Sequence, residues 1–105
     1  MSFQIQYQQK RLSAADAIRV VMNGDTSVVP TGGGEPPALL TALSEQRTRF
    51  KGVEVSQILP VRRFGYFDPA TVQHVRHTAY FFGGASRAGG QEGWVDYRAS
   101  YFSEM

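Results

Sequence analysis

Apolar and polar positions follow a helical period in some stretches of the chain and a strand period in others, which predicts helices and strands in turn. Residues 13–22 place apolar side chains three and four positions apart, as one face of a helix requires. Ser13 and Asp16 have the spacing of a capping box at its start, and Asn23 with Gly24 supplies a stop at its end. The apolar stripe of this predicted helix consists of Ala17, Ile18, Val21 and Met22.

Four segments have the composition of β-strands, because they are short, rich in β-branched or aromatic residues, and bounded by Gly, Pro or Asp. The unbroken apolar run of the third predicts burial on both faces, and the alternation of the fourth predicts burial on one. The expected strands are residues 26–29, 53–59, 78–82 and 95–101.

Two further helices are expected between these strands. A helix over residues 38–50 begins after Pro36-Pro37, because proline in a first turn lacks only an N–H that would be unpaired there. A short, poor helix over residues 85–93 is interrupted by Gly89-Gly90. The apolar face of the first of these helices consists of Leu39, Leu40, Leu43 and Phe50.

The remaining segments are a long loop and an N-terminal arm. Residues 60–73 contain turn signals and three aromatic residues, which predicts a loop with its own aromatic packing. Residues 1–12 are polar and glutamine-rich, so we expect an extended or irregular arm ahead of one α/β unit over residues 13–105. Strands that alternate with helices predict an open, mainly parallel sheet with flanking helices and right-handed crossovers.

Composition narrows the class of protein. The chain has 105 residues and is 42% hydrophobic and 19% charged, which is typical of a folded domain. Its net charge of +2 is too small to indicate a nucleic-acid partner, and the absence of cysteine excludes disulfides and thiolate chemistry. No apolar run approaches the roughly 20 residues that span a bilayer, and the N-terminus lacks the pattern of a signal peptide, so we expect a cytoplasmic protein without a membrane partner.

The segment Pro30-Thr-Gly-Gly-Gly-Glu-Pro-Pro37 is the strongest functional signal. A strand, a glycine loop and a helix start in series bring unpaired backbone N–H groups together, which favours an anion site at the carboxyl end of the sheet. The loop lacks the Lys and Ser or Thr of a P-loop, and Pro37 stands where a dinucleotide fingerprint has its third glycine. A plain turn remains the alternative.

Other candidate chemistry is weaker. His74 and His77 would share a face on a helix, but without cysteine or a nearby acidic partner a hydrogen-bonding role is favoured over zinc, and no metal site is predicted. Strand-spaced aromatic residues without interleaved basic residues favour core packing over base stacking. No Ser-His-Asp order can be assigned. These aromatic residues are Tyr80, Phe81, Phe82, Tyr97 and Tyr101.

Taken together, several segments resemble the N-terminal part of the acetyl-CoA hydrolase/transferase family, which contains 4-hydroxybutyrate and acetate CoA-transferases. The resemblance rests on the order and spacing of these segments from about Tyr7 to the last residue. They are Ser13-Ala-Ala-Asp-Ala17 with Asn23-Gly-Asp25, Gly32-Gly-Gly-Glu-Pro-Pro-Ala-Leu-Leu40, His74-Val-Arg-His77, and Asp96-Tyr97 leading to Ser103-Glu104.

The resemblance implies a longer enzyme with two related α/β domains, in which CoA passes between carboxylic acids through a glutamyl-CoA thioester. It implies that the catalytic glutamate lies in a C-terminal half, so no catalytic residue is assigned to this chain. It also implies that Gly33, Gly34 and Glu35 line the acyl or carboxylate pocket, with coenzyme A as a substrate and no permanently bound cofactor. Glu35 is either a helix-start residue favoured by the helix dipole or a residue that orients a substrate hydroxyl or a neighbouring group.

Two functions follow from these observations. The first is the N-terminal portion of a CoA-transferase or acyl-CoA hydrolase, inactive without its C-terminal half. The alternative is a stand-alone small-anion-binding or interaction module without catalytic activity. In either case exposed sheet edges predict a homo-oligomer.

Overall fold

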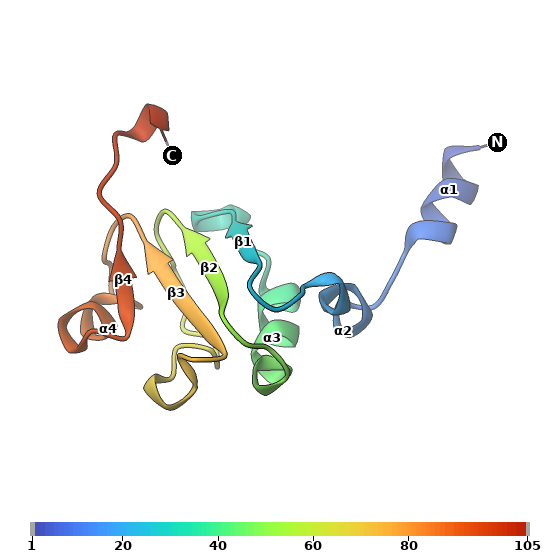
Figure 1. The fold of residues 1–105 in the computed structure, drawn as a ribbon. Coiled ribbons are helices and arrows are strands. Elements are labelled where there is room, and N and C mark those ends of the chain that lie inside the picture. The colour runs from blue at the N-terminus through green and yellow to red at the C-terminus, as the bar shows by residue number, and fades with distance from the viewer. Residues whose placement is uncertain (1, 105) are drawn as a thin grey trace.

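Four parallel strands form one sheet, in which the spatial order of the strands is their order along the chain (Figure 1). The computed structural model describes residues 2–104. All three strand pairings are parallel, which confirms the predicted open parallel α/β architecture. The strands are β1 (Thr26–Val29), β2 (Val53–Gln57), β3 (Val75–Ala79) and β4 (Val95–Tyr97).

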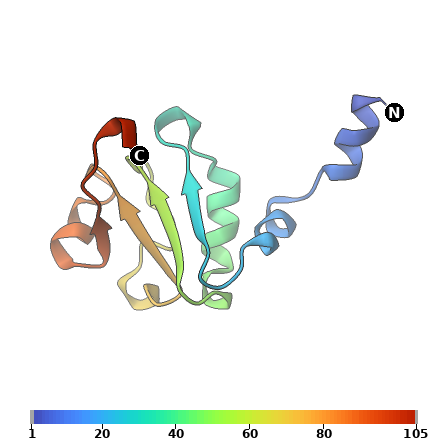
Figure 2. The ribbon, with the colours of Figure 1, turned by 45° about the horizontal axis from the view of Figure 1, so that its top comes forward.

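The connections between the strands gather on one face of the sheet. When neighbouring strands follow one another along the chain, right-handed crossovers place every connection on the same side. Helix α3 (Pro37–Glu45) connects β1 to β2 and lies behind the sheet in Figure 1, and the turned view of Figure 2 shows it alongside β1. Helix α4 (Arg87–Glu92) connects β3 to β4, and the short helix α2 (Ala14–Ala17) packs on α3.

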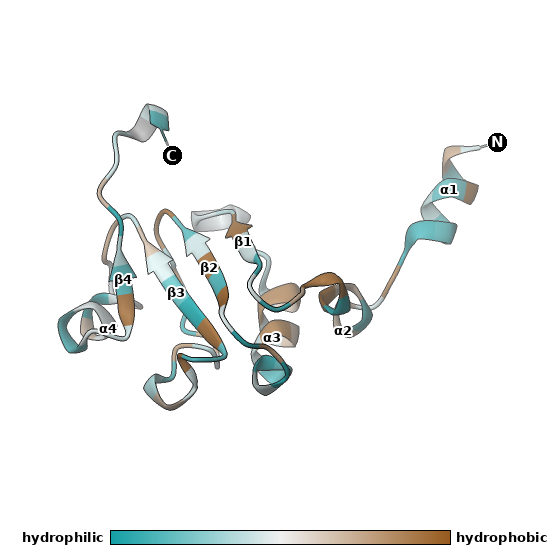
Figure 3. Cartoon of the chain, viewed as in Figure 1, coloured by the Kyte–Doolittle hydropathy of each residue, from teal (hydrophilic) through white to brown (hydrophobic). Residues whose placement is uncertain are grey.

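The core lies between this face and its connections. Alternate strand residues point into it, and the helix and loop side chains that meet them are aliphatic or aromatic. Figure 3 shows the hydrophobic colouring concentrated on α2 and α3 and on alternate parts of the strands. The buried apolar residues of the strands are Val29, Val53, Val55, Val75, Ala79 and Val95, and the same core contains Leu40, Leu43, Phe50, Tyr66, Phe67 and Trp94.

The opposite face of the sheet is polar. Arg76 on β3 makes a two-pronged ion pair with Asp96 on β4, in which its Nη2 lies 2.8 Å from Oδ1. Glu54 on β2 accepts a hydrogen bond from Thr78 and forms an ion pair with Arg98. Val28 on β1 is 82% exposed, so nothing within residues 2–104 covers this end of the face.

The N-terminal arm is helical, and the expectation of an extended or irregular segment was wrong. Helix α1 (Phe3–Lys10) starts at Ser2, whose hydroxyl accepts a hydrogen bond from the N–H of Ile5. Glutamine and lysine are good helix formers, and this local preference is expressed because no tertiary contact opposes it. No residue of α1 is buried, and the helix stands away from the sheet in Figure 1.

The first predicted helix begins as expected and ends early. Ser13 caps the N–H of Asp16, but α2 passes into a 3₁₀ turn at Ile18–Val20 and does not reach residue 22. Asn23 and Gly24 instead form the turn that enters β1. There the Asn23 side chain accepts from the N–H of Lys51, and Gly24 takes a left-handed φ of 81°.

The third strand lies three residues earlier than predicted. Residues 75–79 alternate between the two faces. Their pairing with β2 sets valines side by side in the core, and their pairing with β4 brings Arg76 within reach of Asp96. The apolar run after Ala79 leaves the sheet, so its burial on both strand faces was wrongly predicted. Phe82 packs edge-on against Tyr97 with ring centroids 5.5 Å apart, and Phe81 is exposed.

Three other predicted elements are shorter than expected. The helix over residues 38–50 is α3 followed by a 3₁₀ turn at Arg47–Arg49, and the strands over 53–59 and 95–101 stop at Gln57 and Tyr97. Tyr97 and Tyr101 are exposed, which contradicts the predicted burial of one face along that fourth segment. The aromatic packing predicted for the long loop is confirmed, since Tyr66 and Phe67 are buried in the core.

The glycines of α4 are required by packing although they weaken the helix. A Cβ at Gly89 would press against Val95 and would lie 3.1 Å from two ring atoms of Trp94. We therefore expect Gly89→Ala to destabilise the domain by about 1–3 kcal/mol through overpacking, despite the better helix propensity of alanine.

Urea unfolding followed by circular dichroism measures this effect, with Gly84→Ala as the control. A Cβ at Gly84 meets nothing within 4 Å, so that variant should stay close to the parent. A Gly89→Ala domain as stable as the parent would show that the contact between α4 and β4 is loose.

Candidate functional site

The glycine segment folds into a tight turn at the carboxyl end of β1. Gly32–Gly34 form one 3₁₀ turn, and Gly32 has a left-handed φ of 62° that favours glycine. Glu35 follows the turn, and α3 begins at Pro37. The carboxyl ends of β1 and β2 lie at the same sheet edge, so this turn faces the residues that follow β2.

Hydrogen bonds tie the turn to that second segment. The Thr31 hydroxyl accepts from the N–H of Leu59 at 3.0 Å and donates to the carbonyl of the same residue. The side chain of Gln57, the last residue of β2, donates from Nε2 to the carbonyl of Pro30 at 3.0 Å. Both ends of the loop therefore rest on residues 57–61.

Glu35 is buried at the centre of these contacts. Its Oε2 accepts from Nε2 of Gln57 at 2.6 Å and from the N–H of Val61 at 3.2 Å. Its Oε1 is buried and has no hydrogen-bond partner within residues 2–104. An unpaired buried carboxylate oxygen costs free energy unless a water or a ligand donates to it. Glu35 is therefore an oriented acceptor and does not cap α3.

Only some of the backbone N–H groups in the glycine loop are free to bind a ligand. The N–H of Gly34 donates to Thr31 and the N–H of Glu35 donates to Gly32, so both are used inside the turn. Pro36 and Pro37 have no N–H. Within residues 2–104, the N–H groups of Gly32 and Gly33 have no acceptor, and both glycines are exposed.

Of the other polar groups near this site, His77 was predicted from the sequence only as a hydrogen-bonding residue, and Gln57 and Tyr66 were not singled out. Gln57, Tyr66 and His77 are almost fully buried, and Gln57 Oε1, the Tyr66 hydroxyl and both ring nitrogens of His77 have no partner among the described residues. Burial, and secondarily the charge of Glu35, raise the pKa of Tyr66, so its hydroxyl stays protonated. The sequence signal that could have identified Gln57 is its position as a polar residue at the end of a strand with buried apolar side chains.

The two histidines do not share a face. His74 precedes β3, and its Nδ1 lies 2.7 Å from the carbonyl of Phe50, while His77 lies within β3 and points into the core. The helical pairing considered for them was wrong, because side chains three apart on a strand point to opposite faces. His77 stacks on Tyr66 and meets the edge of Phe67 with ring centroids 4.7 Å apart.

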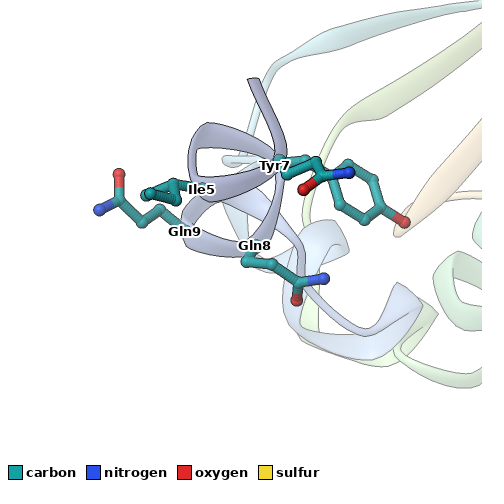
Figure 4. Close-up of a pocket in the computed structure, with 5 residues that line it drawn as sticks. Ile5, Tyr7, Gln8 and Gln9 are labelled. Carbon is teal, nitrogen blue, oxygen red and sulfur yellow. The ribbon is translucent and has the colours of Figure 1, made fainter. Parts of the chain in front are cut away.

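Two hollows bear on where a ligand would bind. One lies at the carboxyl ends of β1 and β2, next to the glycine turn, and includes Pro30, Thr31, Gln57 and Tyr80 in its wall. The other, drawn in Figure 4, runs along α1 beside Ile5, Tyr7, Gln8 and Gln9. The hollow on α1 is remote from the strand ends, so the first is the candidate site.

Neither a metal-binding cluster nor a membrane-spanning helix is found among the described residues. No group of three His, Cys, Asp or Glu side chains in residues 2–104 is arranged to hold a metal ion. Within the same residues, no helix has the length and apolar character needed to cross a membrane.

Comparison with known proteins shows that the chain is similar to a portion of two CoA transferases, about a quarter of each. It is 33% identical to the succinyl-CoA:cyclohexane-1-carboxylate CoA transferase of Geobacter metallireducens over 99% of this chain and 24% of that protein. It is 28% identical to the 4-hydroxybutyrate coenzyme A transferase of Clostridium kluyveri over 94% of this chain and 23% of that protein. These matches confirm the predicted resemblance.

A solved structure supports the fold. RipA from Yersinia pestis superposes with a TM-score of 0.83 at 22% identity, over 99% of this chain and 27% of that one. No protein-family model matches the chain. The chain therefore spans about a quarter of the length of the relatives it matches.

The buried His77 makes stability depend on pH. Burial lowers its pKa to about 4, against about 6.5 when unfolded, so the unfolded chain binds the extra proton between these values. The contribution of neutral His77 to the free energy of unfolding is therefore fully present above about pH 6.5. It is lost as the pH falls towards 4, and the loss amounts to about 3 kcal/mol.

We expect His77→Phe to weaken this dependence of stability on pH, and His74→Gln to preserve it. The measurement is the midpoint of urea unfolding at pH 7 and at pH 5 for each variant. An equal fall of the midpoint between these pH values in the parent and in His77→Phe would contradict the assignment to His77.

Proposed function

We propose that this chain, a homologue of CoA transferases over nearly its whole length, forms the wall of the acyl or carboxylate pocket of such an enzyme. The observation that carries the proposal is the buried Glu35 carboxylate, whose Oε2 is held by two donors and whose Oε1 has no partner within residues 2–104. The hollow at the ends of β1 and β2 is lined by Pro30, Thr31 and Gln57, which adjoin the turn, although Glu35 itself is not part of its wall.

The geometry suits Glu35 to binding and not to nucleophilic attack. A nucleophilic carboxylate must reach the thioester carbonyl, but Glu35 is 8% exposed and is held by two N–H donors. Donated hydrogen bonds stabilise the carboxylate charge and lower its reactivity. We therefore propose that the glutamate that carries CoA as a thioester lies outside these residues, and that coenzyme A enters as a substrate without a permanent cofactor.

The loop and Glu35 would hold different parts of the substrate. The free N–H groups of Gly32 and Gly33 suit a carboxylate or thioester oxygen, as donors at a turn commonly do. Glu35 Oε1 suits a hydroxyl or amide hydrogen, since a second carboxylate beside it would be repelled. Gly33 and Glu35 thus remain proposed substrate-binding residues, and Gly32 joins them. The N–H of Gly34 is used inside the turn and offers the substrate no donor.

The exposed edge of the sheet at β1 indicates a surface where another chain could pack. Val28 is exposed on a sheet edge strand, and the face that carries the Arg76–Asp96 pair holds no buried apolar cluster. Unpaired strand edges favour pairing with another strand. We propose that this edge is covered in the assembled enzyme, and that the isolated chain associates with itself.

Complementation tests the proposed function. The chain is co-expressed with the part of the Clostridium kluyveri transferase outside the aligned quarter, and CoA transfer from acetyl-CoA to 4-hydroxybutyrate is assayed. We expect no exchange by the chain alone and exchange by the pair. We expect Glu35→Gln to lower kcat/KM of the pair about 10- to 100-fold, because it removes a charged acceptor worth about 1.5–3 kcal/mol.

The control is Glu45→Gln, at an exposed position on α3, which should leave the rate unchanged. Size-exclusion chromatography establishes that the two parts form a complex. A complex that neither exchanges CoA nor forms a borohydride-sensitive glutamyl thioester would refute the proposal.

A second candidate function is a stand-alone small-anion-binding module, and the unpaired N–H groups of Gly32 and Gly33 favour it. If it holds, calorimetry of the 105-residue chain with acetate, phosphate or coenzyme A will show saturable binding that Gly33→Val abolishes. A Cβ at Gly33 meets nothing within 4 Å, so this substitution tests access to the N–H groups and not folding. Absence of heat with all three ligands would eliminate this function.

A further inference from the structure

The amide orientation of Gln57 is fixed by two acceptors. Its Nε2 donates one hydrogen to the Pro30 carbonyl at 3.0 Å and lies 2.6 Å from Oε2 of Glu35. If the amide were turned over, its oxygen would face both of these oxygens and lose both bonds. The side chain is 1% exposed, so water cannot replace them.

These two bonds join the residues on either side of the glycine turn. Pro30 precedes the turn and Glu35 follows it, so one side chain holds both ends of residues 31–34. Thr31 adds a contact to Leu59 on the same side, but it does not reach Glu35. Gln57 is therefore the described side chain that determines both where the turn lies and which oxygen of Glu35 is left free.

We infer that Gln57 is the positioning residue of this site, which holds the glycine turn and presents Oε1 of Glu35 as an acceptor. The inference rests on the proposed function for its use of Glu35, but the position of the turn is a property of the chain itself. With its hydrogens used, Gln57 leaves its own Oε1 as a second acceptor without a partner. Each of these oxygens therefore suits a group with a hydrogen to donate, and the hydroxyl of a hydroxyacyl chain supplies one such hydrogen.

Two isosteric substitutions separate positioning from binding. Gln57→Met keeps the volume of the side chain and removes both donors, so the turn loses its connection to Glu35. Glu35→Gln keeps an oxygen for Gln57 and Val61 and replaces Oε1 by an NH₂ group, so the turn stays in place while the atom without a partner changes from acceptor to donor.

The experiment is NMR relaxation and amide hydrogen exchange on the 105-residue chain. In the parent we expect backbone order parameters of about 0.85 at Gly32–Gly34 and a protected N–H at Val61. In Gln57→Met we expect the order parameters to fall below about 0.6 and exchange at Val61 to quicken at least about tenfold. Glu35→Gln should keep both values of the parent.

The matched control is Gln46→Met, which removes a hydrogen bond from Nε2 to the carbonyl of Ala15 and one that Oε1 accepts from Arg49, both at the other end of α3 from the turn. It should leave residues 31–35 unchanged. A rigid turn and a protected Val61 in Gln57→Met would overturn the inference, as would equal loosening in Gln46→Met. In the complemented enzyme, Glu35→Gln losing activity with an ordered turn supports both proposals, whereas unchanged activity in Glu35→Gln refutes the function and leaves the positioning role standing.

Discussion

The burial of the Glu35 carboxylate is the constraint on which the carboxyl end of the sheet depends. A charge removed from water needs donors, and the chain supplies them from Gln57 and from the backbone of Val61. Both donors belong to the segment that leaves β2. The glycine turn after β1 is therefore joined to the loop after β2, and residues 30–35 and 57–61 form one structural unit.

The register of the sheet makes this joining possible. Parallel pairing of Val29 with Gln57 brings the last residues of β1 and β2 together, so the Gln57 side chain reaches back under Pro30. Gln57 lies on the same face as Val53 and Val55 and closes that apolar row with an amide. The neighbouring row, His77 with its aromatic contacts to Tyr66 and Phe67, fills the space beneath. The polar site thus rests directly on the hydrophobic core.

The sequence was sufficient for features that depend on neighbouring residues. The cap at Ser13, strand β1, the entry to α3 at Pro37 and the parallel order all follow from local chemistry and chain direction. The third strand was misplaced because the choice between residues 75–79 and 78–82 is made by distant partners, β2 on one edge and Asp96 on the other. Local β-propensity favours the aromatic run, and tertiary pairing overrides it.

In the candidate site too, local sequence predicts one part, and the other part depends on residues far apart in the chain. The glycine turn and Glu35 were visible as a motif, but the role of Glu35 was left between helix start and substrate contact. Its burial depends on Gln57, 22 residues away, and on Val61 beyond it. No spacing rule connects those positions, since the connection is made by strand register. Tyr66 and His77 were likewise seen only as an aromatic and a histidine, without their shared packing.

The geometry also limits which ligands the proposed site could accept. Two unit charges 4 Å apart repel by about 4 kcal/mol at an effective dielectric constant of 20, so a substrate carboxylate cannot lie against Glu35 Oε1. The free N–H groups of Gly32 and Gly33 lie on the exposed side of the turn, and Glu35 lies on its buried side. A ligand that uses both must be anionic or carbonyl-like at one end and carry a hydrogen-bond donor at the other. An acyl chain with a hydroxyl satisfies both demands, whereas a dicarboxylate satisfies only the first.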